Sequence, residues 1–124
     1  MENGKTRSET GKLVEDYASN YLNQRGLRQI ERNYRCRGGE IDLIMRDGKT
    51  LVFVEVRYRK HHSFGGAAAS VDWRKQQRLV LAAQHYLQRQ SVNDLPCRFD
   101  VVAVSPGTSG DFSVQWIKNA IETS

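Results

Sequence analysis

Hydrophobic positions along the chain predict two helices and five strands. Apolar residues recur at helical spacing over about 11–25, and Gly26 is typical of a helix C-terminus. A second helix is predicted over about 71–89, with Ser70 as its N-cap and a buried stripe of Leu79, Val80, Ala82, Ala83, Tyr86 and Leu87. Extended segments are predicted at 27–34, 40–45, 50–58, 97–105 and 112–117. The expected order is therefore helix, three strands, helix, two strands, which is an α/β arrangement.

The second and third strands are predicted to form a hairpin. Asp47-Gly48 between two β-rich runs is typical of a two-residue turn. With these residues at the tip, Asp42 faces Phe53 and Glu40 faces Glu55. Alternation predicts one wholly apolar core face with Ile41, Leu43, Met45, Val52, Val54, Val56 and Tyr58. The other face collects Glu40, Asp42, Ile44, Leu51, Phe53, Glu55 and Arg57.

The composition is that of one globular domain. The chain has 124 residues, of which 39% are hydrophobic and 27% charged. We expect a single domain over 1–124, with a flexible tail at 1–10 and a frayed end at 118–124. The longest apolar runs are far shorter than the roughly 20 residues of a membrane-spanning helix. The first ten residues lack an apolar secretory region, so the expected location is the cytoplasm.

The two cysteines are expected to be free thiols. Cys36 and Cys97 stand far apart in the sequence, without the spacing of a zinc site or a redox motif.

Basic charge is concentrated in one segment. The formal net charge is +5, and segment 57–78 holds Arg57, Arg59, Lys60, Arg74, Lys75 and Arg78 against Asp72 alone. The planar arginine side chain suits phosphate oxygens, so this segment favours a polyanionic partner such as nucleic acid. The alternative is a solvated basic face that serves solubility.

The polar face of the hairpin gathers carboxylates. In the predicted register Glu40 and Glu55 are cross-strand neighbours and Asp42 is diagonal to Glu55, an arrangement that is destabilising unless something compensates the charge. Mg²⁺ is bound by one or two carboxylates together with water and substrate phosphates, so a cation shared by two of these acids is one interpretation. The alternative is that each acid pairs with an arginine on a solvated sheet face.

The helices contribute further candidates. Helical spacing places Glu15 at the border of the buried stripe and directs Asp16 to solvent. In the second helix Lys75 and Gln76 lie on the side of Leu79, which makes them candidate substrate contacts, although a lysine that merely snorkels to solvent fits equally well. Arg74 and Arg78 are expected to project outward.

Several other chemical groups are given structural interpretations. His61 and His62 lie in a segment that is expected to be a mobile loop, and a solvated pair is favoured over a metal ligand or general base. Asp100 is interpreted as a hydrogen-bonded structural aspartate. Trp73 and Trp116 are interpreted as packing residues of the core or a lid rather than as platforms for base stacking.

Two segments together resemble a nuclease signature. Gly39-Glu-Ile-Asp-Leu-Ile44, a short hairpin, and Val52-Phe-Val-Glu-Val-Arg57 are similar to the split PD-(D/E)xK motif. The element order resembles the restriction-endonuclease-like core, in which helices flank a mixed sheet. Glu15, the arginine-rich first strand, the helix with Lys75 and Tyr86-Leu87, and Arg98-Phe-Asp-Val-Val102 make the YraN-like (UPF0102) family the closer match, over about 11–105. This family is similar to archaeal Holliday-junction resolvases.

The resemblance implies a site for Mg²⁺ or Mn²⁺. Asp42 and Glu55 would bind the metal, the Val56 carbonyl would complete its shell, and Glu15 would assist directly or through water. A homodimer is a candidate assembly, since resolvase-like proteins work as dimers.

One position departs from the signature. Its usual lysine is replaced by Arg57, and an arginine effectively never loses its proton. Arg57 would therefore stabilise charge on the phosphate without acting as a base. Water activation would rest on the metal or on a second carboxylate such as Glu40.

These observations lead to two hypotheses of different classes. The first is a Mg²⁺-dependent phosphodiesterase of DNA, an endonuclease that prefers branched structures. Its basic segment 57–78, including Gln76, would grip the backbone with little base readout. The second is a non-catalytic nucleic-acid-binding module that keeps the nuclease fold. A protein-interaction scaffold draws only on the basic face and is the weakest alternative.

Overall fold

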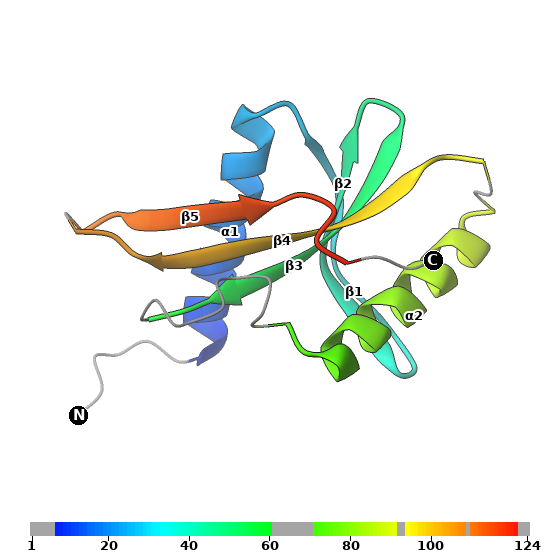
Figure 1. Cartoon of the computed structure of the whole chain (residues 1–124), viewed down its shortest axis with the longest axis horizontal. Coiled ribbons are helices and arrows are strands. Elements are labelled where there is room, and N and C mark those ends of the chain that lie inside the picture. The colour runs from blue at the N-terminus through cyan, green and yellow to red at the C-terminus, as the bar shows by residue number, and fades with distance from the viewer. Residues whose placement is uncertain (1–6, 61–70, 92–93, 109, 122–124) are drawn as a thin grey trace.

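A computed structural model describes residues 7–60, 71–91, 94–108 and 110–121, and within them the chain forms one five-stranded sheet and two helices (Figure 1). The strands are β1 (Arg28–Cys36), β2 (Gly39–Asp47), β3 (Thr50–Tyr58), β4 (Cys97–Pro106) and β5 (Phe112–Ile117), and the helices are α1 (Arg7–Gln24) and α2 (Trp73–Arg89). The strands lie side by side in chain order. β3 and β4 run parallel and the other neighbours antiparallel. The predicted element order and the mixed sheet are confirmed.

Both faces of the sheet are buried. α1 packs on one face, where its Val14, Ala18 and Leu22 meet a cluster that includes Leu43, Met45, Val52 and Val54. α2 packs on the other face, where Leu79, Ala82, Ala83 and Tyr86 meet Ile44, Leu51 and Phe53. Figure 1 shows α1 crossing behind the strands, with α2 at the lower right beside β1. The predicted stripe of α2 is confirmed, whereas the prediction of a single apolar sheet face is wrong because α2 covers the second one.

The β2–β3 turn lies one residue later than predicted. β2 continues through Asp47 and β3 begins at Thr50, so the two turn residues are Gly48 and Lys49. Gly48 has φ +62°, and a type II′ turn requires glycine at its first central position.

This turn shifts the predicted cross-strand pairs. The structure pairs Ile44 with Phe53 and Leu43 with Val54. The predicted pairings of Phe53 with Asp42 and of Glu55 with Glu40 are therefore wrong. A shift of the turn by one residue changes the pairing by two, so Phe53 keeps the face predicted for it.

β1 is irregular in its middle. Asn33 has φ +55°, a left-handed conformation that asparagine tolerates better than most residues. Tyr34 and its partner Ile41 lie just past this point and pack in the cluster under α2, whereas Leu43 packs under α1. The prediction that Ile41 shares a face with Leu43 is therefore wrong.

Several predicted ends are corrected. α1 begins at Arg7, so residues 7–10 belong to a helix rather than to a tail. The N-cap of α2 is Asp72, whose carboxylate accepts from the Lys75 N–H at 2.9 Å; Ser70 and the predicted loop with His61 and His62 lie outside the described residues.

The end of the described chain is also ordered by contacts. The Ala120 N–H donates to the Phe99 carbonyl at 2.7 Å, and Ile121 is buried. The prediction of a frayed end is therefore wrong for residues 118–121.

Asp100 holds β4, β5 and the chain after β5 together. It is fully buried and accepts hydrogen bonds from Arg98 Nε (3.1 Å), Trp116 Nε1 (2.9 Å) and the Asn119 N–H (2.9 Å). A buried carboxylate needs such partners, so the interpretation of Asp100 as a structural residue is confirmed. Cys36 and Cys97 are free, as predicted.

Candidate functional site

The regular pairing of β2 with β3 stops just before the two acids of the predicted site. Leu43 opposite Val54 is the last regular pair toward this end of the hairpin. One residue further along each strand stand Asp42 and Glu55, and the Val56 N–H donates to Asp42 Oδ2 at 2.8 Å. A side-chain carboxylate thus accepts from the backbone of β3 at the point where the ladder ends. This bond fixes Asp42 next to Glu55.

Two cations face the Glu55 carboxylate. Lys75 Nζ of α2 lies 3.4 Å from Glu55 Oε2, and an Arg57 terminal nitrogen lies 3.7 Å from the same oxygen. Glu55 is only 2% exposed, whereas both cations are about one-third exposed. The prediction that Lys75 turns inward is confirmed. A buried carboxylate, its two counter-ions and Asp42 therefore meet where β3 passes the first turn of α2.

Both carboxyl groups hold protons more tightly than usual. Burial, followed by the charge of Asp42, raises the pKa of Glu55 to about 7, against the lowering effect of Lys75 and Arg57. Burial also raises the pKa of Asp42, although the hydrogen bond from the Val56 N–H opposes the shift. Two carboxylates that repel each other where water is excluded favour the binding of a proton or another cation between them.

Glu15 approaches the pair from α1. It is partly buried, accepts from the Asn33 side-chain amide at 3.3 Å, and has its pKa raised by burial and then by the charge of Asp42. Asp16, one residue on, is about two-fifths exposed and forms ion pairs with Lys12 and Arg32. The predicted inward direction of Glu15 is confirmed, and Asp16 points to a different set of partners.

Glu40 does not face Glu55. Its partner in the sheet is Arg35 of β1, and the two side chains form an ion pair of 3.7 Å. Its charge still contributes to the raised pKa of Asp42, so it lies near the site without sharing the predicted cross-strand position.

The donor set fits an open divalent-ion site better than a closed one. Within the described residues, no three side chains of His, Cys, Asp or Glu are grouped closely enough to hold a metal. Mg²⁺ usually keeps several waters and takes one or two carboxylates plus substrate phosphates. Asp42 and Glu55 provide the two carboxylates, and burial is the largest cause of the raised pKa of each. The two acids therefore suit Mg²⁺ or Mn²⁺ held jointly with a substrate.

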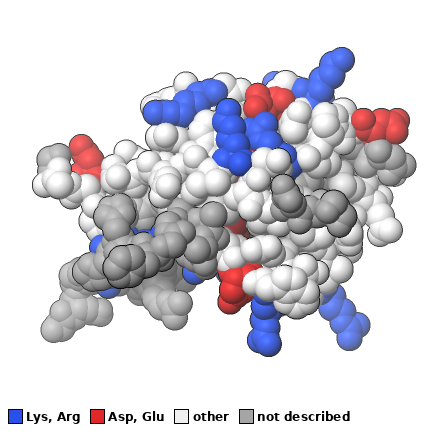
Figure 2. Space-filling view, in the orientation of Figure 1, with Lys and Arg blue, Asp and Glu red and all other residues white. Residues whose placement is uncertain are grey.

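The predicted backbone-gripping residues differ in their placement. Arg74 and Arg78 are exposed on α2, and Lys60 is exposed beyond β3. Gln76 donates from its side chain to the Val71 carbonyl at 3.0 Å and so supports the entry to α2, and its contact with a substrate stays a prediction. Arg59 is half-buried, and its N–H donates to the Val104 carbonyl at 2.9 Å. The face seen in Figure 2 carries scattered basic and acidic side chains without an unbroken basic field.

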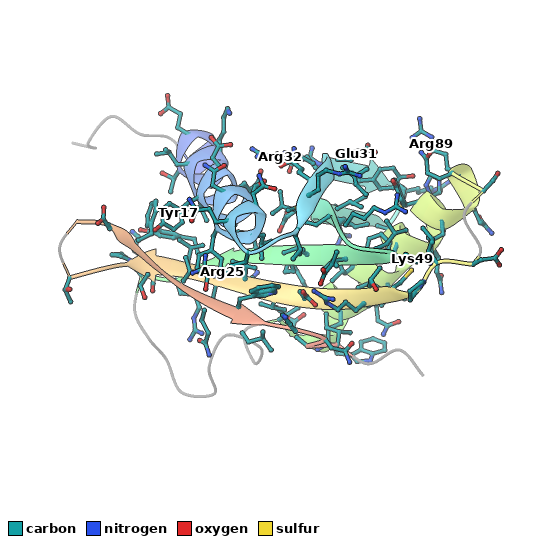
Figure 3. All side chains as sticks on the ribbon, turned by 90° about the horizontal axis from the view of Figure 1, so that it is seen from above. Tyr17, Arg25, Glu31, Arg32, Lys49 and Arg89 are labelled. Atoms are coloured by element: carbon teal, nitrogen blue, oxygen red, sulfur yellow. The ribbon has the colours of Figure 1, made fainter. Side chains whose placement is uncertain are left out.

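A cavity of about 370 Å³ opens at the Glu15 side of the site, between α1 and β1. It is lined by Gly11, Lys12, Glu15, Arg32, Asn33 and Arg35. Figure 3 shows Arg32 on β1 beside α1. The arginines that line the cavity are paired with nearby acids, since Arg32 bonds to Asp16 and Arg35 pairs with Glu40. The cavity does not include Asp42 or Glu55, so the chemistry described above does not depend on it.

Asn33 is a site residue that the sequence pattern did not predict. Its only signal is the tolerance of asparagine for a left-handed backbone, which a strand-like pattern hides. The position becomes visible only when the fold brings its amide to Glu15.

Comparison with known sequences identifies the family. Residues 14–104 match the family described as "Uncharacterised protein family UPF0102". The chain belongs to the UPF0102 family. A UPF0102 protein of Janthinobacterium sp. (strain Marseille) is 58% identical over 112 residues, covering 90% of this chain and 86% of the relative. A UPF0102 protein of Methylococcus capsulatus is 56% identical over 119 residues, covering 96% and 95%.

The UPF0102 match spans every element that builds the site. It runs from Val14, just before Glu15, to Val104 in β4, and so includes β2, β3 and α2. Among the described residues of this UPF0102 protein, neither helix is both long and apolar enough to cross a membrane.

Proposed function

We propose that this UPF0102 protein is a metal-dependent DNA phosphodiesterase, an endonuclease with the restriction-endonuclease-like fold. The observation that carries the proposal is the meeting of Asp42, Glu55 and Lys75 at one point where β2 and β3 part. Two carboxylates with a lysine beside them are the three side chains that the nuclease signature requires. The strand position of that lysine holds Arg57, yet Lys75 Nζ lies 3.4 Å from Glu55 and supplies the ammonium group from α2.

Asp42, Glu55 and the Val56 carbonyl would hold Mg²⁺ or Mn²⁺. When bound, such an ion neutralises charge on a phosphoryl oxygen and lowers the pKa of its water. The hydrogen bond from the Val56 N–H keeps Asp42 in place as a ligand, and Glu15 is near enough to act on the same site through water.

The basic side chains have separate tasks in this proposal. Lys75 and Arg57, each about one-third exposed, would meet the oxygens of the phosphate that is cut. Arg74, Arg78 and Lys60 would contact neighbouring phosphates, which positions DNA without reading its sequence. A preference for branched DNA, a cytoplasmic location and a homodimer belong to the same proposal.

One observation favours a second candidate, a non-catalytic nucleic-acid-binding module. Glu55 already has two cations within 4 Å, so its negative charge is partly satisfied without a metal. If Lys75 and Arg57 act only as counter-ions, the fold and its basic residues would bind DNA and leave it intact.

Cleavage assays separate the two candidates. Labelled four-way junction, flap, blunt duplex and single-stranded DNA are incubated with Mg²⁺, Mn²⁺ or chelator. The proteins are wild type, Asp42→Asn, Glu55→Gln and, as a control, the exposed Asp111→Asn. Asparagine at position 42 still offers an oxygen to the Val56 N–H, so its effect reports on charge rather than on folding.

The nuclease proposal expects divalent-dependent cleavage by wild type and Asp111→Asn. Asp42→Asn and Glu55→Gln should each lower the rate by roughly two orders of magnitude or more. Salt-sensitive binding of DNA by wild type without cleavage in either metal would contradict the proposal and favour the binding module.

A further inference from the structure

Trp73 is a large aromatic side chain left open to solvent. It is the first residue of α2 and is 72% exposed, the highest value among the exposed large hydrophobic residues of the described chain. Of the two predicted kinds of packing, packing in the core is wrong, and packing in a lid stays a prediction. Trp116 differs, because it is half-buried, donates to Asp100 and has Tyr21 at its edge. Most of the indole surface is open to solvent, and within the described residues Trp73 has no aromatic partner.

The neighbours of Trp73 are cations and amides. Arg74 and Arg78 are exposed one helical turn apart, and Gln77 is exposed on the same outer side. Lys75, two residues along the helix, points the other way and reaches Glu55. Because a helix turns by about 100° and rises by about 1.5 Å per residue, Trp73 and Lys75 project from opposite sides of the first turn of α2. The indole therefore stands on the outer side of the helix end whose inner side carries Lys75.

An exposed aromatic ring beside arginines is the combination that binds unpaired nucleic acid. A base stacks on the ring while the cations follow the phosphates, and any base can do so because every base has a π face. In an intact duplex the base faces cover one another. Trp73 could therefore stack only on a base at an end, a gap, a branch or a single strand.

From this placement we propose that Trp73 stacks on an unpaired base of a strand whose phosphates contact Arg74 and Arg78, and so makes the protein select DNA with unpaired bases. The inference rests on the proposed function, since it assumes that this face binds DNA. It goes further by assigning the preference for DNA structure to one side chain.

Binding is measured in chelator, which keeps the test independent of cleavage. Fluorescence anisotropy compares a single-stranded thymine oligonucleotide with a blunt duplex of equal length. The variants are Trp73→Ala and Trp73→Phe. Leu81→Ala is the matched control, because Leu81 is another exposed hydrophobic residue of α2, 45% exposed, two turns further along. Since Trp73 is exposed, its replacement should leave the fold intact, which a thermal melt verifies.

Trp73→Ala should weaken binding to the single strand by about ten-fold and to the duplex by less than about two-fold. Trp73→Phe should keep most of the affinity, and Leu81→Ala should match wild type. Equal losses on both DNAs, or no loss on either, would overturn the inference while leaving the proposed function intact. Absence of DNA binding by wild type would overturn both.

Discussion

At the residue scale, Glu55 links the stability of the fold to its chemistry. Its carboxyl group is almost completely buried beside another acid, and its pKa is raised to about 7. A site that holds such a group without a closed ligand set favours the uptake of a cation.

The raised pKa of Glu55 makes stability depend on pH. Between about pH 4.5 and about 7 the folded protein keeps a proton that the unfolded chain has lost, so the free energy of unfolding falls as pH rises, by at most roughly 3–4 kcal/mol. Glu55→Gln removes this contribution. In thermal melts in chelator at about pH 5 and about pH 8, wild type and the control Asp111→Asn should lose more Tm than Glu55→Gln. An equal loss in all three proteins would contradict the raised pKa.

Replacement of Lys75 tests whether an ammonium group from α2 contributes to the rate of cleavage. Removal of one group that stabilises charge on the reacting phosphate typically costs about 10²-fold in rate. Lys75→Ala should therefore slow cleavage by about that factor while Mn²⁺ binding is kept, because the variant removes a cation that competes for Glu55. Arg89→Ala, which alters an exposed cation in the last turn of the same helix, should cleave nearly as fast as wild type. Undiminished cleavage by Lys75→Ala would show that Lys75 is only a counter-ion.

At the element scale, the position of Lys75 depends on how closely α2 approaches β2. Gly39 at the start of β2 has no side chain, and a Cβ there would collide with the Arg78 carbonyl and lie 3.0 Å from the Ala82 backbone nitrogen. Both obstacles are backbone atoms of α2, so they cannot move aside as a flexible side chain would. Gly39 therefore sets the distance between the helix that carries Lys75 and the strand that carries Asp42.

Replacement of this glycine should be costly. Gly39→Ala is expected to lower the free energy of unfolding by about 1–3 kcal/mol, because α2 must shift, and to lower cleavage with it. Gly11→Ala is the control, since Gly11 lies in α1 with open space around its Cβ position and should gain about 0.5–1 kcal/mol. Urea unfolding measures both values. A Gly39→Ala protein as stable as wild type would contradict this contact.

The sequence predicted the order of elements because their patterns are strong and local. The stripe of α2 and the limits of β5 agree closely with the structure. The turn register could not be derived in the same way, because Asp47, Gly48 and Lys49 allow two placements of a two-residue turn. The local pattern also gave no sign that the face with Ile44 and Phe53 is covered by α2, a contact between residues far apart in the chain.

The acids of the candidate site could be predicted from the sequence, but some of the residues that contact these acids could not. Alternation places Asp42 and Glu55 on the same face of the hairpin, and helical spacing directs Glu15 and Lys75 inward. The ion pair of Lys75 with Glu55 and the amide of Asn33 on Glu15 depend on tertiary packing. Glu40 was misplaced because its position followed from the wrong register.

At the scale of the whole molecule, a net charge of +5 favours association with a polyanion. DNA affinity should fall steeply with salt, because each cation that contacts a phosphate releases a counter-ion. The double variant Arg74→Ala/Arg78→Ala should lower the slope of log affinity against log salt by about 2. Anisotropy titrations across a range of salt concentrations measure this slope. An unchanged slope would show that this end of α2 does not contact the backbone.

The proposed chemistry depends on Asp42 and Glu55 holding one divalent ion between them. Calorimetric titration of Mn²⁺ into wild type, Asp42→Asn, Glu55→Gln and Asp111→Asn tests this directly, without DNA and without turnover. Wild type and Asp111→Asn should bind one ion, and each of the other two variants should bind it at least about ten-fold more weakly. Binding of equal strength in all four proteins, or no binding by wild type, would contradict the account.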